Sequence, residues 1–204
     1  MADYIAPPTS KNAKPEHETT GIGDLVRTRD AWLLVLLCFS LVPAYLIISG
    51  VFVSFGADAK GLDVQTAVWF VSVASILQVV GRFVIPSTSD RVGRRAAFFG
   101  VLGIMAAGVA LLVGTNEMVY ALAFCALSFA YGGGVTAMPA IISDRLGTAN
   151  ATQNIAFAEL GTLLGSVVAT ALVNTLATTS ALVTAGVLSA ALGTVALLGI
   201  YRKG

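Results

Sequence analysis

Long stretches without charge constrain the fold of this chain more than any other feature. The sequence has six apolar segments, and the only charged residues inside them are Arg82 and Glu159: 31–55, 65–85, 96–114, 118–142, 151–176 and 181–201. An apolar run of 18 or more residues predicts a membrane-spanning helix, because about 20 residues at 1.5 Å each cross the hydrocarbon core. A helix also satisfies its own backbone groups in lipid. We therefore expect an all-α membrane protein with six transmembrane helices, each antiparallel to the next because the connections are short.

Composition excludes several other classes. Charged residues make up 11% of the chain, against about 25% in an ordinary soluble domain. A net charge of +1 without a basic stripe argues against a nucleic-acid partner. Cys38 and Cys125 lie within apolar segments, where packing is a better interpretation than a disulfide or metal pair. The sequence has no nucleophile elbow, phosphate loop or His/Cys/Asp cluster, so we expect no enzyme activity, no cofactor and no metal site.

The segments outside the spans predict the orientation. Residues 1–30 are polar and lack the apolar core of a signal peptide, so we expect a largely disordered tail with a short interfacial piece near residue 22. The transmembrane domain then covers 31–201, and 202–204 form the C-terminal end. With the N-terminal tail in the cytoplasm, every Lys and Arg except Lys60 falls on the cytoplasmic side. We therefore expect both termini in the cytoplasm and a location in the plasma membrane.

One loop carries a charged motif, "DRVGRR". Asp90 and Arg91 stand at the end of one predicted helix, and Arg94 and Arg95 open the next. Gly93 permits a tight reversal between them. The aspartate can pair with arginines of its own loop or cap a neighbouring helix N-terminus. Such a cluster can hold one conformation and release it in another.

These residues resemble the cytoplasmic loop motif of the major facilitator superfamily, commonly written G-x-x-x-D-R-x-G-R-R. The D-R-x-G-R-R part is complete, whereas the first glycine falls on Pro86, which suggests a kink in place of a close helix contact. The stretch "YGGGVTAMPAIISDRLG" at 131–147 and "RTRDAWLL" at 27–34 resemble the oxalate/formate antiporter and monocarboxylate-transporter-like branch. The resemblance covers about residues 27–201 and aligns with the C-terminal half of those proteins.

The resemblance implies one half of a twelve-helix secondary carrier that works by alternating access. It implies small organic anions as substrates, with a second six-helix half, either a second copy or a separate chain, as a partner beside the lipid bilayer. Carriers of oxalate and formate in this branch use a lysine in the eleventh helix. The matching segment, 151–176, has no basic residue and holds Glu159. Proton-linked carriage of a monocarboxylate therefore fits better than dicarboxylate exchange. The alternative is a truncated or regulatory six-helix protein without transport activity.

Ionisable groups within the spans are the main candidates for a site, since each costs roughly 2.5–3.5 kcal/mol at mid-bilayer. Glu159 shares a helix face with Thr162 and Ser166. It is either a proton or cation carrier, a substrate contact, or a structural carboxyl bonded to a neighbouring helix. Arg82 shares a face with Gln78, and it either binds an anionic substrate or extends to the nearby interface.

Further candidates rest on weaker patterns. The third and sixth segments almost lack polar side chains and are expected to face lipid. The resemblance implies the same outer position for these two, with the other four helices approaching a substrate path. Tyr45 and Tyr131 are possible cavity residues. Asp144 and Arg145 belong to a second cytoplasmic loop, "SDRLG", which repeats "SDRVG". Small residues and one proline could serve either gating or helix packing: Gly132, Gly133, Gly134, Pro139, Gly161 and Gly165.

Overall fold

The structure, a computed structural model, describes residues 21–114, 116–176 and 178–201. Over these ranges the regular elements are helices: α1 (Ile22–Arg27), α2 (Arg29–Leu41), α3 (Pro43–Lys60), α4 (Val64–Val92), α5 (Arg94–Val113), α6 (Glu117–Leu146), α7 (Ala151–Ala158), α8 (Leu160–Thr175) and α9 (Thr178–Tyr201). Six stretches are long and apolar enough to cross a membrane: Arg29–Lys60, Val64–Val92, Arg94–Val113, Glu117–Leu146, Ala151–Thr175 and Thr178–Tyr201. The predicted all-α fold with six spans is confirmed.

Two of the six spans are interrupted. The first consists of α2 and α3, which meet at Val42 just before Pro43, a residue without a backbone N–H. There the Val42 N–H donates to the carbonyl of Phe39 (3.2 Å), a tighter turn than in an α-helix. The fifth span consists of α7 and α8, which meet at Glu159. The sequence pattern predicted a continuous helix in both places.

The two repeated charged segments form helix ends, as predicted for Asp90 and Arg91, and the helices extend beyond the apolar segments 65–85 and 118–142 into the stretches described as loops. Helix α4 continues to Val92 and α6 to Leu146, and a glycine follows each helix; Gly93 alone separates α4 from α5, whereas 147–150 separate α6 from α7. Gly93 has φ +91° and Gly147 has φ +82°, a backbone region that glycine adopts readily. Each glycine N–H donates to the carbonyl four residues earlier at 3.0 Å. The repeat in the sequence thus corresponds to one turn geometry used twice.

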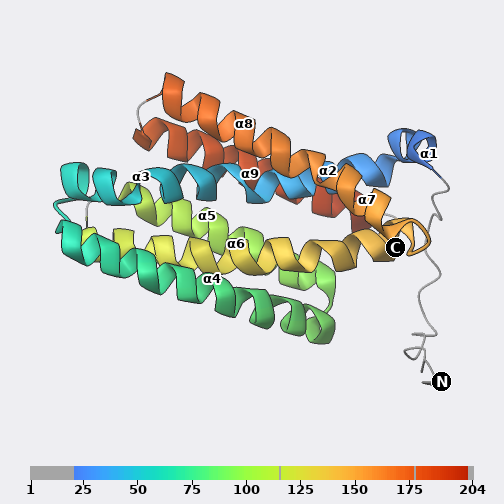
Figure 1. Ribbon diagram of the computed structural model, residues 1–204, viewed down its shortest axis with the longest axis horizontal. Helices are drawn as coiled ribbons and strands as arrows, with labels where there is room; N and C mark the ends of the chain where they lie inside the picture. The colour runs from blue at the N-terminus through green and yellow to red at the C-terminus, as the bar shows by residue number, and fades with distance from the viewer. Residues whose placement is uncertain (1–20, 115, 177, 202–204) are drawn as a thin grey trace, which may run out of the picture.

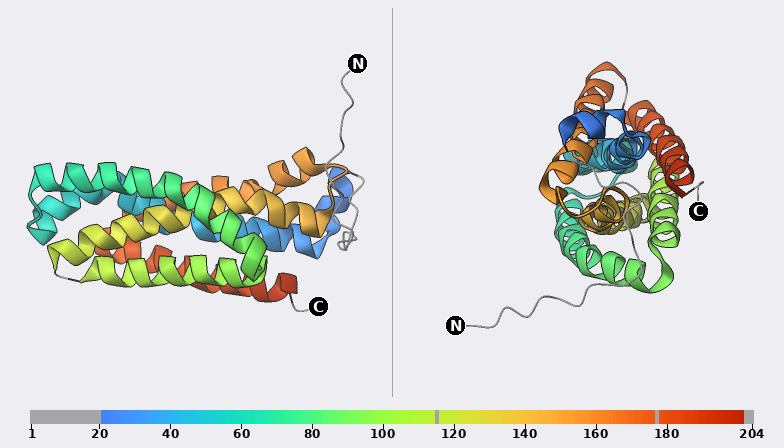
Figure 2. Two further views of the ribbon diagram at one scale, coloured as in Figure 1. Left: turned by 90° about the horizontal axis from the view of Figure 1, so that it is seen from below. Right: turned by 90° about the vertical axis from the view of Figure 1, so that its right-hand side faces the viewer.

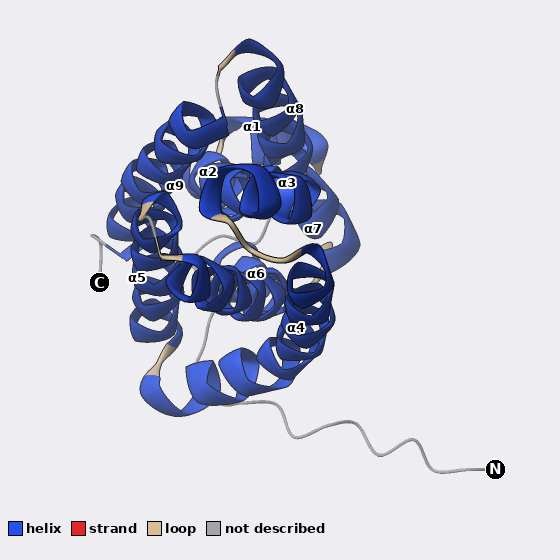
Figure 3. Ribbon diagram, turned by 90° about the vertical axis from the view of Figure 1, so that its left-hand side faces the viewer, coloured by secondary structure: helices blue, strands red, loops and turns tan. Residues whose placement is uncertain are grey.

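The spans pack in two rows of three, as the end-on view in Figure 3 shows. The first span (α2–α3) and α6 occupy the middle of the rows. Helices α9 and α5 lie on one side of this middle pair, and α7–α8 and α4 lie on the other (Figures 2 and 3). This arrangement leaves α4 and the fifth span bordering the same flank of the bundle.

Both ends of the described chain lie at the same end of the bundle. Helix α1 and the last turn of α9 are found there, together with the α4–α5 and α6–α7 connections (Figure 1). We call this the loop end. At the opposite end the Lys60 ammonium donates to the carbonyls of Val113 (3.2 Å) and Gly114 (2.6 Å). The charged motif and its repeat therefore share the end opposite to Lys60. That the loop end faces the cytoplasm stays a prediction.

Of the predicted N-terminal tail, residues 1–20 lie outside the described part of the chain, as do 202–204 at the C-terminus. The predicted interfacial piece contains α1. Leu25 of this helix is buried, and the Trp32 indole N–H donates to the carbonyl of Val26 (2.8 Å). These contacts hold α1 against the start of the first span.

Glycines bring the helix backbones close together in two places. A β-carbon at Gly81 of α4 would overlap the carbonyl of Phe129 in α6, and one at Gly132 would overlap the carbonyl of Gln78. A β-carbon at Gly161 of α8 would overlap the carbonyl of Val35 in α2. The close approach of α4 to α6 therefore occurs at Gly81, although Pro86 stands at the glycine position of the motif.

Burial is uneven among the spans. Residues of the first span and α6 are mostly buried, whereas only 17% of the most apolar window of α4 and 22% of that of the fifth span are buried. The corresponding windows of α5 and α9, the spans expected to face lipid, are 39% and 44% buried. The largest uncovered apolar surface thus belongs to α4 and α7–α8, on one flank of the bundle.

Candidate functional site

The loop end holds a cluster of charged and aromatic side chains, which we call the charge cluster: Asp90, Arg94, Arg95, Asp144, Arg145 and Tyr201. Nη1 of Arg94 lies 2.7 Å from Oδ2 of Asp144, while Nη2 lies 4.0 Å from Oδ1 of Asp90. The first contact is ionic and lacks hydrogen-bond alignment. The Asp90 side chain is 70% exposed. Arg94 therefore pairs mainly with Asp144, and this ion pair joins the start of α5 to the end of α6.

Tyr201, at the end of α9, completes the cluster. Its ring centre lies 4.5 Å from the Arg145 guanidinium carbon and 5.8 Å from that of Arg95, distances at which cation–π attraction operates. Arg95 also lies 5.9 Å from the ring of Phe99. Sequence reasoning missed Tyr201, because it is the last residue of a span without charge. Its position beside three basic residues appears only once the helices are packed.

A buried amide supports the turn after Arg145. Asn154 of α7 is fully buried, and its Nδ2 donates to the carbonyls of Leu146 (3.2 Å) and Gly147 (3.3 Å). Carbonyls in the last turn of a helix lack partners within the helix, so such bonds stabilise the end of α6. Asn154 was also missed, since an amide in a polar stretch of a predicted span gives no signal of its role.

A second group lies within the spans, and we call it the interior polar group: Tyr45, Arg82, Tyr131 and Glu159. The rings of Tyr45 (α3) and Tyr131 (α6) stack with centroids 4.0 Å apart and planes inclined by 14°. The buried Ser128 hydroxyl of α6 donates to the carbonyl of Phe124 (2.9 Å). Arg82 acts electrostatically on both tyrosines, and Glu159 acts on Tyr131. Four of the candidates predicted from the sequence therefore come together, one from each of four spans.

Two members of this group, Arg82 and Glu159, carry ionisable side chains. Among the described residues neither Arg82 nor Glu159 takes part in an ion pair. Arg82 is exposed, while Glu159 and the two tyrosines are half-buried. Glu159 stands at the junction of α7 and α8, and it also acts electrostatically on the Cys38 thiol of α2. Arg82 and Glu159 lie on α4 and the fifth span, the elements that border the uncovered flank of the bundle, while the two tyrosines lie on the middle pair.

Other predicted candidates have local roles. The Ser166 hydroxyl donates to the carbonyl of Thr162 (2.9 Å), so it bonds along its own helix. Gln78 is half-buried and its backbone touches Gly132. Helix packing accounts for the predicted small residues, which all lie in contacts between helices: Gly132, Gly133, Gly134, Gly161 and Gly165. Pro139 is exposed.

These features define an integral, multi-pass helical membrane protein with an uncovered apolar flank and a charge cluster between two helix ends. The Major Facilitator Superfamily model matches residues 3–170, and the chain belongs to this family. The chain is similar to the "Uncharacterized MFS-type transporter YhjX" of Escherichia coli (strain K12), at 26% identity over 148 residues. That match covers 72% of this chain and 37% of the relative, so the chain spans just over a third of the relative's length.

The ion pair of Arg94 can be measured by double-mutant cycles. Combining Arg94→Gln with Asp144→Asn should give a coupling energy of about 1 kcal/mol, because the pair is close and Arg94 is only partly exposed. The matched cycle with Asp90→Asn should give a few tenths of a kcal/mol or less, since that contact is longer and exposed. Thermal unfolding of the purified chain in detergent measures both. Equal coupling in the two cycles would contradict a preference of Arg94 for Asp144, and larger coupling to Asp90 would show that Arg94 pairs within its own motif.

Proposed function

We propose that the chain forms a six-helix half of a secondary carrier for small organic anions, which works by alternating access. Membership in the family supports transport as its activity. The observation that carries the substrate class is the interior polar group, in which an exposed arginine and a carboxyl group flank a pair of stacked tyrosines. Ionisable groups at membrane depth are costly and typically mark a substrate or ion path.

A monocarboxylate suits this group. The guanidinium of Arg82 can accept one carboxylate in a bidentate arrangement, and phenolic hydroxyls of Tyr45 and Tyr131 can donate hydrogen bonds to the same anion. A second cationic group, which a dicarboxylate would require, is not found among the described residues near Arg82. In the proposed carrier the Glu159 carboxyl group carries the coupled proton. Uptake of the anion together with a proton follows from these roles.

A partner half follows from the shape of the chain. A carrier has to enclose its path, whereas α4 and the fifth span present uncovered apolar surface beside the interior polar group. In the proposed carrier a second six-helix unit, either a second copy or a separate chain, covers this flank in the plasma membrane. The charge cluster then holds the helix ends in one conformation, and separation of Arg94 from Asp144 accompanies the change to the other.

Glu159→Gln tests the proton-linked step. Vesicles that contain the chain together with its partner half should take up monocarboxylates faster under an inward proton gradient. In the Glu159→Gln variant this acceleration should disappear while exchange of labelled anion continues. The reason is that glutamine can form hydrogen bonds but cannot bind and release a proton as a carboxylate does. Initial rates of labelled lactate, formate and oxalate uptake, each with and without the gradient, measure the effect.

The matched control is Glu117→Gln, which alters an exposed carboxyl at the opposite end of the bundle and should leave the response to the gradient intact. A gradient response that survives in Glu159→Gln would remove Glu159 from the coupling step. An absence of flux for all three anions in the unmodified protein would instead favour a six-helix membrane protein without transport activity.

A further inference from the structure

We propose that the groove between α4 and α5 at the loop end binds an anionic phospholipid, with the headgroup at Arg91 and one acyl chain between the helices. This site is separate from the interior polar group. It lies on the flank of α4 that faces α5, away from the flank bordered by the fifth span (Figure 3). The proposal is therefore independent of the transport activity proposed above.

The apolar part of the site is a hollow of about 340 Å³ between the two helices. Val84 and Val92 of α4 form one wall, Ala96, Gly100 and Ile104 of α5 form the other, and Phe129 of α6 lies at the floor. Small residues on α5 create the space, and a β-carbon at Gly100 would meet no atom within 4 Å. From residue 96 to 104 the groove runs roughly 12 Å along the helix, most of the depth of one hydrocarbon leaflet, which is about 15 Å.

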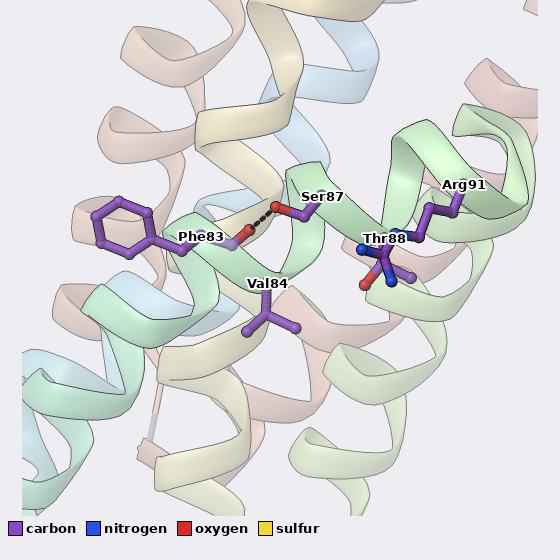
Figure 4. Close-up of a pocket in the computed structure, with 5 residues that line it drawn as sticks. All are labelled: Phe83, Val84, Ser87, Thr88 and Arg91. Carbon is purple, nitrogen blue, oxygen red and sulfur yellow. Dashed lines mark hydrogen bonds between the residues drawn. The ribbon is translucent and has the colours of Figure 1, made fainter.

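The polar part of the site adjoins this groove. A second hollow of about 320 Å³ is lined by Phe83, Val84, Ser87, Thr88 and Arg91, as Figure 4 shows. Val84 and Thr88 line both hollows, so the two are continuous along α4. The Ser87 hydroxyl donates to the carbonyl of Phe83 (2.7 Å), which leaves its oxygen free to accept a bond from a headgroup.

Charge identifies the kind of lipid. Arg91 is exposed and forms no ion pair with another described residue, while its neighbour Asp90 lies toward Arg94. The guanidinium is thus free for a phosphodiester, to which it can donate two parallel hydrogen bonds. A basic side chain at the membrane surface favours lipids with a net negative charge. The combination of one cationic rim and one apolar channel matches a phospholipid, because a soluble anion would leave the channel empty.

The test uses the purified full chain in detergent, supplied with phosphatidylglycerol or phosphatidylcholine of the same acyl composition. Native mass spectrometry reports the number of retained lipids and the affinity for each. We expect stronger retention of phosphatidylglycerol. Arg91→Gln should weaken that retention about fivefold and abolish the preference, and Gly100→Leu should reduce retention of both lipids by filling the groove.

Two matched controls accompany these variants. Gly103→Leu adds the same side chain to α5 at another open position outside the groove, and Arg29→Gln removes a different exposed charge from the loop end. Both should retain phosphatidylglycerol as the unmodified chain does. If Gly100→Leu fails to fold, as judged by size exclusion, Ala96→Leu fills the same groove.

Three outcomes would overturn the proposal. Equal retention of the two lipids would remove the headgroup specificity. Unchanged retention in both Arg91→Gln and Gly100→Leu would place the bound lipid elsewhere. Dimers that dissociate in Gly100→Leu, without any change in lipid retention, would show that a second copy of the chain covers the groove.

Discussion

Replacing Gly161 by alanine should destabilise the protein by about 2–3 kcal/mol, although alanine is the better helix former. A β-carbon at this position would overlap the Val35 carbonyl and come close to the Phe39 N–H of α2. Backbone atoms cannot move aside as a flexible side chain would, so the two spans have to separate. Insertion of even one methyl group into a packed contact typically costs 1–3 kcal/mol. Thermal unfolding in detergent, followed by circular dichroism, measures the change.

Gly103→Ala is the matched control for this prediction. A β-carbon there meets no atom within 4 Å, so the substitution should be neutral or stabilise the helix by about 0.5–1 kcal/mol. The two substitutions are chemically identical and are expected to differ in sign. Destabilisation of the same size in both would mean that the loss does not arise from the α2–α8 contact, and a neutral Gly161→Ala would mean that this contact is looser than described.

The course of the six spans could be predicted from the sequence, because membrane insertion depends on local apolar length. The extents of the helices were less predictable. The apolar segments were predicted to end at 85 and 142, whereas in the structure the polar residues that follow remain helical up to Val92 and Leu146. Polar residues can continue a helix beyond the hydrocarbon region, where water and neighbouring charges satisfy them. Hydrophobicity therefore marks the membrane boundary and not the helix end.

Some parts of the candidate site could be predicted from the sequence, whereas others depend on how the helices pack. The four members of the interior polar group were among the candidates taken from the sequence, because ionisable and aromatic residues stand out against an apolar background; that they form a site stays a prediction. That Tyr45 and Tyr131 stack on each other could not be predicted, since this depends on the packing of α3 against α6. For the same reason the pairing of Arg94 with Asp144 could not be predicted, as 50 residues of chain separate two similar turns. The place of Tyr201 among the arginines depends on α9 ending beside both of them.

The break at Glu159 joins the fold to the proposed function. A continuous fifth span would present Glu159, Thr162 and Ser166 as one stripe, as the heptad spacing suggested. In the structure Glu159 stands at the junction of α7 and α8, close to Gly161 and the contact with α2. Carriers commonly build their midplane sites from interrupted helices. A movement of α7 relative to α8 would therefore change the surroundings of Glu159 directly.

Substitution of Arg82 should have the largest effect on transport. In the proposed carrier its guanidinium pairs with the carboxylate of the substrate, and each hydrogen bond to a charged group contributes about 1.5–3 kcal/mol. Arg82→Gln should therefore raise the half-saturating concentration of a monocarboxylate roughly 10- to 150-fold. Arg82→Lys keeps the charge but loses the bidentate geometry, so its effect should lie between those of the unmodified protein and the glutamine variant. Uptake rates over a range of substrate concentrations, with the partner half present, measure all three.

Arg29→Gln is the control for Arg82, because it removes an exposed positive charge from the loop end without touching the interior polar group. The alternative for Arg82 is a side chain that merely extends toward the interface, where it would serve membrane anchoring. The two roles separate in the kinetics. An anchoring arginine would change the amount of folded protein in the membrane and the maximal rate together, and would leave the half-saturating concentration unchanged. A substrate contact changes the half-saturating concentration even after rates are corrected for protein amount. An Arg82→Gln carrier with unaltered half-saturation for formate, lactate and oxalate would exclude Arg82 from anion binding and leave the stacked tyrosines without a cationic partner.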